Sequence, residues 1–171
     1  MIILVYKKIF VVFFGLAFLL VVIYLFILQP HQIVGTSMEP SIKNRQVYLV
    51  NKAAYLLASP NRGDVVVYEV SSKSYGDFIG RIISLPGEAI KITEDGKVYI
   101  NQKLLDEPYI EGVTYVKGSG ILSNEQEVVV PENEFFVLGD NRYHSSDSRQ
   151  FGFVKRSDIV GKLVTCILNC K

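Results

Sequence analysis

The sequence has little net charge and few residues that bind metals. Its 171 residues contain 18 lysines and arginines against 17 aspartates and glutamates, so the formal net charge is +1. Nucleic acids are bound by concentrated positive charge, and no basic block with interleaved aromatic residues occurs here. We therefore expect no nucleic-acid partner.

Cysteine and histidine occur only twice each. Cys166 and Cys170 stand near the carboxyl end, far in sequence from either histidine, so the spacing of a four-ligand zinc site is absent and we expect no metal. In an extended segment the two cysteines would lie about 13 Å apart, too far for a disulfide, although a helical turn would bring them within bridging range. We expect two free thiols.

One long apolar run stands out. Residues 9–28 form about twenty uncharged apolar positions, and at about 1.5 Å of rise per residue a helix of that length spans a hydrocarbon core of about 30 Å. A cleaved secretory signal has a shorter apolar stretch followed by a small-x-small site, and this run has neither feature. We therefore predict that 9–28 is a retained transmembrane anchor.

Basic residues on either side of the run bear on its orientation. Lys7 and Lys8 directly precede it, and the positive-inside tendency then puts residues 1–8 in the cytoplasm and 29–171 outside the cell membrane. Three basic residues beyond the other end favour the reverse orientation: Lys43, Arg45 and Lys52. The first orientation, a single-pass membrane protein with an extracytoplasmic domain, is our prediction.

After the anchor, the pattern changes to short runs rich in Val, Ile, Tyr and Phe, which are typical of β-strands. The clearest runs are 46–50, 65–70, 78–83 and 135–138. Glu94-Asp95-Gly96 separates two further runs, 89–93 and 97–101, and Asp-Gly between alternating runs predicts a hairpin. A helical apolar pattern appears only at 52–58, and 105–127 has little periodicity. We predict a mostly β protein, a transmembrane helix followed by an antiparallel sheet domain, with 105–127 as an excursion from the core.

Three segments carry polar or turn-forming residues within this β-patterned chain: 35–40 (GTSMEP), 80–88 (GRIISLPGE) and 139–149 (GDNRYHSSDSR). Each alone has an ordinary explanation as a turn stabilised by local hydrogen bonds. Together, in this order behind an anchor, they resemble type I signal peptidases, the membrane serine proteases that remove signal peptides from exported proteins. The resemblance, which includes the strand-like stretch 63–68, extends from the anchor to about Val160.

This resemblance implies roles for individual residues. Ser37, in a complete Ser-Met-x-Pro box, is the nucleophile, and its backbone N–H supplies one oxyanion donor. Ser145 and Asp147 orient the base, and Arg149 forms an ion pair with Asp147. Structural support is expected from four residues: Arg81, Asp140, Arg142 and Arg149. Serine acyl transfer needs neither metal nor nucleotide, so no cofactor is expected.

One position departs from the family pattern. The general-base lysine of the family immediately precedes the arginine that aligns with Arg81, and that position here is Gly80. A serine hydroxyl needs a base within about 2.6–3.2 Å, and glycine cannot accept a proton. His144, directly before Ser145, is a candidate substitute because histidine acts as a base without a large pKa shift; the alternative is a solvated loop histidine.

Gly80 leaves three explanations open. The chain is a signal peptidase I that uses another base, a non-catalytic paralogue that binds export substrates or a partner peptidase, or a peptidase whose native lysine was replaced by engineering or error. In the first case the partners are signal peptides of exported preproteins, membrane lipid and the export machinery. The substrate would add to the β-domain as an extended strand, with small residues at positions −1 and −3.

Overall fold

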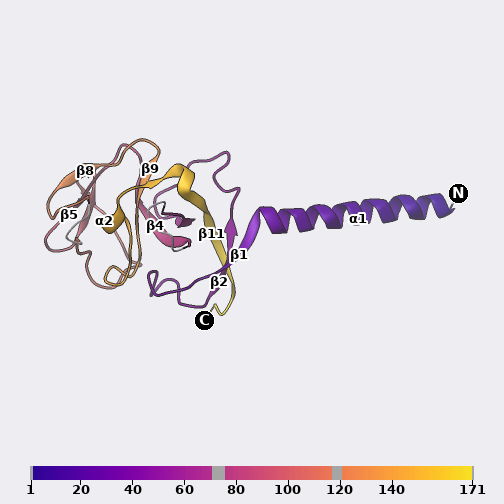
Figure 1. Cartoon of the computed structure of the whole chain (residues 1–171), viewed down its shortest axis with the longest axis horizontal. Coiled ribbons are helices and arrows are strands. Elements are labelled where there is room, and N and C mark those ends of the chain that lie inside the picture. Colours follow the sequence, from indigo (N-terminus) through magenta and orange to yellow (C-terminus); the bar gives the residue numbers. More distant parts are fainter. Residues whose placement is uncertain (1, 71–75, 117–120, 171) are drawn as a thin grey trace.

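A computed structural model of the chain describes residues 2–70, 76–116 and 121–170. A long helix, α1 (Ile2–Phe26), projects from a β-rich body (Figure 1). Its part from Tyr6 to Phe26 has a mean hydropathy of 3.1 and no buried residue, and it is the one described helix that is long and apolar enough to cross a membrane. An unburied apolar helix of this length is the expected form of an anchor.

The carboxyl end of α1 corrects the predicted span of 9–28. The helix ends at Phe26, and Leu28 already belongs to a strand, β1 (Leu28–Gln32). Leu28 pairs with Asn51 of the neighbouring strand β2 (Val47–Asn51). The backbone at Leu28 finds antiparallel hydrogen-bond partners in β2, so sheet pairing begins before the apolar run ends.

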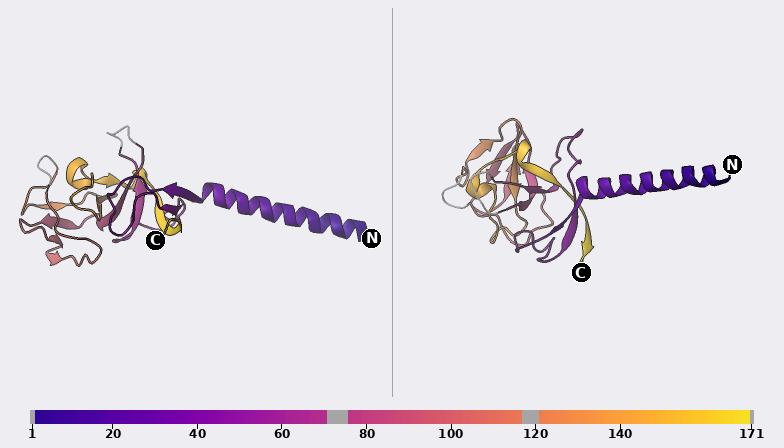
Figure 2. Two further views of the ribbon diagram at one scale, coloured as in Figure 1. Left: turned by 90° about the horizontal axis from the view of Figure 1, so that it is seen from below. Right: turned by 45° about the vertical axis from the view of Figure 1, so that its right-hand side comes forward.

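Two antiparallel sheets make up the body (Figure 2). The larger has seven strands in the order β1-β2-β11-β3-β4-β9-β10. Its further strands are β3 (Val65–Tyr68), β4 (Phe78–Ser84), β9 (Glu134–Leu138), β10 (Val154–Lys155) and β11 (Ile159–Leu168). The smaller sheet has four strands in the order β7-β6-β5-β8, which are β5 (Ala89–Ile92), β6 (Val98–Ile100), β7 (Lys103–Leu104) and β8 (Glu127–Val129). Two short helices are α2 (Ser148–Phe151) and the 3₁₀ helix η1 (Arg156–Asp158).

The predicted β elements are confirmed. The four runs form β2, β3, β4 and β9 with ends shifted by one or two residues, and β5 pairs with β6 as the predicted hairpin. Gly96 in its turn has φ 78°, a left-handed conformation that glycine adopts without steric cost. The weak helical pattern at 52–58 does not correspond to a helix, because this segment forms turns before Pro60.

Strand β9 is buried on both faces and separates two parts of the core. Phe136 and Leu138 pack with the smaller sheet, whereas Phe135 and Val137 pack with β3 and β4. Side chains alternate along a strand, so each face of β9 serves a different cluster. The loop that leaves β9 therefore begins from a strand with little freedom to move.

The predicted excursion, 105–127, has no regular structure in its described part up to residue 126, but it packs on the core. Leu122 belongs to the core cluster around the smaller sheet, and Thr114 is fully buried. Glu107 and Tyr109 contribute to a polar network described below. The segment therefore covers one side of the body.

Cys166 and Cys170 form a disulfide, which corrects the expected free thiols. Their Cα atoms lie 5.7 Å apart. β11 ends at Leu168, and Asn169 has φ 59°, a left-handed conformation that turns the chain. The extended spacing assumed from sequence does not apply across this turn.

Candidate active site

Ser37 lies in a turn whose next residue is fixed in the core. Met38 is 1% exposed and packs with Val50 and Val67, while the N–H of Ile42 donates to Met38 O at 2.8 Å. Ser37 itself is partly exposed. The buried methionine therefore anchors the turn and leaves the serine at the surface.

The turn of Ser37 docks on the loop that follows β9. Asn141 donates from its backbone N–H to Ser37 O at 2.9 Å and from its side-chain amide to Thr36 O at 3.1 Å. A Cβ atom on Gly139 would lie 2.5 Å from Ser37 O and 2.4 Å from Ser145 Cβ. Only glycine fits between them, so the structure brings Ser37 and Ser145 together across Gly139.

Ser145, Asp147 and Arg149 form one buried polar network. The Ser145 hydroxyl donates to Asp147 Oδ2, and Arg149 donates to both carboxylate oxygens of Asp147, at 2.8 and 2.6 Å. Arg149 also donates to Ser145 Oγ at 2.8 Å, and the N–H of Gly139 donates to Asp147 at 3.2 Å. All three side chains are at most 2% exposed. The expected ion pair is therefore present, and it fixes the orientation of Ser145.

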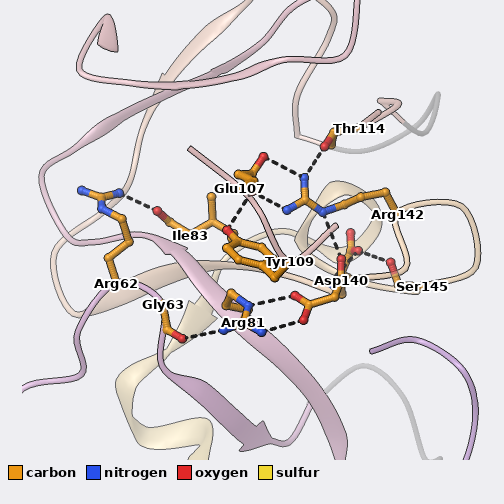
Figure 3. A network of polar contacts seen from close by, with 12 residues as sticks. Arg62, Gly63, Arg81, Ile83, Glu107, Tyr109, Thr114, Asp140, Arg142 and Ser145 are labelled. Carbon is orange, nitrogen blue, oxygen red and sulfur yellow. Dashed lines mark hydrogen bonds and ion pairs between the residues drawn. The ribbon is translucent and has the colours of Figure 1, made fainter. Parts of the chain in front are cut away.

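A second polar network supports the same loop (Figure 3). Arg81 donates to both oxygens of fully buried Asp140, at 2.9 and 2.6 Å, and its guanidinium lies 4.2 Å from the centre of the Tyr109 ring. Arg142 donates to Gly139 O at 3.0 Å and to the Glu107 carboxylate. Burial alone would lower the pKa of Arg81, but its hydrogen bonds to Asp140 outweigh this effect and raise it. The roles of Arg81, Asp140 and Arg142 as structural supports agree with this geometry.

Two members of that network, Glu107 and Tyr109, were not predicted. Both come from the segment without periodicity, so hydrophobic patterning carried no signal for them. Burial and the neighbouring Glu107 raise the pKa of Tyr109, so its phenol stays protonated and donates to Glu107 at 2.9 Å. The excursion thereby supplies the counter-charge for fully buried Arg142.

Gly80, the position of the missing base, has its side-chain space filled. The residue is buried in β4, opposite Val66 of β3. A Cβ atom there would lie 2.6 Å from Val137 Cγ1 and 3.4 Å from Tyr68 Cε1. Tyr68 is fully buried and its hydroxyl has no hydrogen-bond partner among the described residues. Burial and the charge of Asp147 raise the pKa of Tyr68, so this phenol is neutral and does not replace the lysine as a base.

His144 lies in the same loop but outside the buried network. Its side chain is exposed, and only its backbone N–H is fixed, by Asn141 O at 3.1 Å and Asn141 Oδ1 at 3.2 Å. Within the described ranges its ring has no hydrogen bond or ion pair. The ring of His144 is therefore in solvent, although the next residue, Ser145, is buried in the network.

Two cavities lie along the segment 31–43, which contains Ser37. One, of 680 Å³, is bordered by Glu39, Pro40 and Asn141, among others. The other, of 230 Å³, lies between the end of β1 and the start of β4, where His31 Nε2 is 3.4 Å from Asp77 Oδ2. Among the described residues no group of His, Cys, Asp and Glu side chains is arranged to hold a metal ion. A partly exposed serine beside a buried carboxylate network and the 680 Å³ cavity defines a candidate serine hydrolase site.

Comparisons with known proteins identify the family. The family model described as "Signal peptidase, peptidase S26" matches residues 6–168. Signal peptidase I U of Bacillus subtilis (strain 168) is 41% identical over 149 residues, which cover 85% of this chain and 79% of that protein. Signal peptidase I of Bacillus caldolyticus is 38% identical over 146 residues, 81% of this chain and 79% of that protein. The crystal structure of a signal peptidase I from Enterococcus faecalis V583 matches with a TM-score of 0.51 and 34% identity, over 62% of this chain and 97% of that one. The chain therefore belongs to the signal peptidase family, peptidase S26.

The buried ion pair gives a first prediction. Arg149→Met leaves the Asp147 carboxylate buried without its counter-charge, so the free energy of unfolding should fall by about 3–5 kcal/mol. Chemical denaturation of the full chain in detergent measures it. Lys97→Met is the matched control, because its ion pair with Asp95 is exposed and should contribute little. A loss for Arg149→Met no larger than the control's would contradict the structural role of the pair.

Proposed function

We propose that the chain is a membrane-anchored serine endopeptidase that removes signal peptides from exported preproteins by acyl-enzyme chemistry. The observation that carries this proposal is the docking of Ser37 on the loop of Ser145 across Gly139. That contact joins two segments that resemble signal peptidase motifs: the one with the expected nucleophile, Ser37, and the one with the residues expected to orient the base, Ser145 and Asp147. Membership of the signal peptidase family supports the same reaction.

The reaction begins with attack of Ser37 Oγ on the carbonyl carbon of the scissile bond. The N–H of Ser37 donates to the oxyanion that forms, since a carbonyl attacked by this hydroxyl lies beside that amide. A base takes the hydroxyl proton of Ser37 during attack and returns it to the nitrogen of the scissile bond. Collapse of the tetrahedral intermediate then breaks the C–N bond, leaves the signal peptide as an ester on Ser37 and releases the amino group of the mature protein. Water then hydrolyses the ester. Ser145 and Asp147 hold the polar side of the site in place during both steps.

The larger sheet has an edge at which an extended peptide can pair. β1 stands at the edge of the larger sheet, and the 230 Å³ cavity separates its end from β4. An edge strand offers unpaired backbone groups to which a peptide adds as a further strand. We infer that the segment before the scissile bond binds here, with small side chains at −1 and −3.

Helix α1 brings enzyme and substrate together. Its apolar span holds the chain in the membrane lipid, where signal peptides of preproteins are also held, so the effective concentration of the substrate rises. Lys7 and Lys8 favour a cytoplasmic amino end and a β-body on the outer side. There the enzyme would meet preproteins that leave the export machinery.

The base for Ser37 is the least usual part of this proposal. Gly80 has no side chain that can accept a proton. His144 is the candidate base, because its ring is exposed and no hydrogen bond within the described part of the chain restricts its rotation. A non-catalytic paralogue would also explain Gly80, but no observation beyond Gly80 favours it.

Cleavage of a signal-peptide substrate by the purified full chain in detergent tests the function. Ser37→Ala should reduce the rate by several orders of magnitude, because no other group at the site forms the ester. Ser157→Ala, on the exposed 3₁₀ helix η1, should leave the rate unchanged. Cleavage that persists in Ser37→Ala would refute Ser37 as the nucleophile.

The same assay has a second arm for His144. If His144 is the base, His144→Gln removes the proton acceptor and should lower the rate about as much as loss of a general base does, about 10²–10⁴-fold. Lys103→Gln is the control, because it introduces the same side chain at an exposed position of β7 in the smaller sheet, and it should leave the rate unchanged. Equal rates for His144→Gln and the unmodified chain would exclude His144 as the base.

The filled space beside Gly80 gives a further prediction. Gly80→Lys alone forces its Cβ to 2.6 Å from Val137 Cγ1, whereas Val137→Ala removes that atom and leaves Leu138 O, at 3.2 Å, as the nearest neighbour of the new Cβ. The double variant Gly80→Lys/Val137→Ala should therefore cleave about 10²-fold faster or more than Val137→Ala alone. It should also exceed Gly80→Lys. A double variant that melts as a folded protein but cleaves no faster than Val137→Ala would contradict this account of the site.

A further inference from the structure

The 680 Å³ cavity beside Ser37 is bordered by more acidic than basic side chains. Glu39 and Glu111 contribute two carboxylates, and Lys43 contributes the one ammonium. None of these three side chains has an ion pair within the described ranges. Glu39 is partly buried, whereas Glu111 and Lys43 are exposed. At neutral pH the lining of the cavity therefore carries an excess of negative charge.

This cavity follows Ser37 along the chain, whereas the groove proposed for the signal peptide precedes it. The 230 Å³ cavity is bordered by residues 31–34, and the 680 Å³ cavity by Glu39 and Lys43. Asn141, whose N–H donates to Ser37 O at 2.9 Å, also borders the larger cavity, so this cavity reaches the turn of the nucleophile. An extended peptide that fills the smaller cavity and places its scissile carbonyl at Ser37 therefore continues into the larger one.

Contacts between the excursion and its neighbours form the walls of the larger cavity. The Ser41 hydroxyl donates to Tyr109 O at 3.3 Å and joins the segment after the nucleophile to the excursion. Gly112 has φ 86°, and a Cβ atom there would lie 3.1 Å from Tyr143 Cε2. The exposed ring of Tyr143 borders the cavity as well. The excursion is thus held against both other segments, and the acidic lining exists before a peptide binds.

We propose that Glu39 and Glu111 select a basic side chain at the first positions of the mature protein, +1 to +3 after the scissile bond. This inference rests on the proposed function, since it concerns the other half of the same substrate. Three extended residues span about 10 Å, which is comparable with the width of this cavity. A lysine or arginine there pairs with the carboxylates and also meets the ring of Tyr143, whereas an acidic side chain is repelled.

Peptide binding to the full chain carrying Ser37→Ala, in detergent, tests this selection without catalysis. The labelled peptides share one signal-peptide sequence with small residues at −1 and −3. They differ in a single residue, which is lysine, glutamine or glutamate, placed in turn at +1, +2 and +3. Fluorescence anisotropy gives the dissociation constants. At one or more positions we expect lysine to bind about fivefold tighter than glutamate, with glutamine between them, as exposed charge contacts allow.

Charge variants of the protein identify the source of the difference. Glu39→Gln/Glu111→Gln should bring the lysine and glutamate peptides to within about twofold of each other, because no carboxylate then borders the cavity. Lys43→Gln should widen the difference, because it removes the opposing charge. Glu127→Gln is the matched control, since it removes an exposed carboxylate from β8 in the smaller sheet, and it should change neither affinity.

The outcomes separate this inference from the proposed function. Equal affinities for the three side chains at every position would refute the selection and leave the proposed function standing, because the peptides still bind. A lysine preference that persists unchanged in Glu39→Gln/Glu111→Gln would also refute it, since other groups would then recognise the charge. If none of the peptides binds, the chain does not recognise the proposed substrate, and the proposed function and this inference fail together.

Discussion

The buried ion pair of Asp147 with Arg149 is the interaction on which the site depends. Two charges removed from water are tolerated only when every oxygen and N–H of the pair finds a partner, and here Ser145, Gly139 and the first turn of α2 supply them. A loop built around such a pair has one well-defined conformation. The turn of Ser37 docks on that loop through Asn141. The buried network therefore fixes the position of the nucleophile, although Ser37 is not a member of the network.

The fold delivers this loop from a rigid strand. β9 is packed on both faces, and the loop begins directly at its end, while Met38 fixes the turn of Ser37 from the opposite side. The connection between α1 and the body is short, because only one residue separates α1 from β1. The segment after β2 also contacts the end of the helix, through the hydrogen bond from Lys52 N–H to Ile27 O. The proposed active site thus lies on a β-body that is joined directly to the apolar helix.

Sequence patterns predicted what local physics controls. The Asp-Gly turn set the hairpin of β5 and β6, and the identity and order of the three polar segments were enough to single out Ser37, Ser145 and Asp147. Three tertiary effects could not be predicted: strand pairing that ends the helix before the apolar run does, the left-handed Asn169 that allows the disulfide, and the contact of Glu107 with Arg142 from a segment without periodicity. Nor could sequence show that Val137 and Tyr68 fill the space a lysine at position 80 would need.

The central claim is that Ser37 forms the acyl-enzyme, and the most direct measurement uses a p-nitrophenyl ester of a short signal-peptide sequence. p-Nitrophenolate leaves far more readily than the alkoxide of Ser37, so acylation is faster than hydrolysis of the resulting alkyl ester and the adduct accumulates. Mass spectrometry after acid quenching locates the added mass. The account predicts the acyl group on the proteolytic fragment that carries Ser37; an unmodified chain, or an adduct on any other residue, would contradict it.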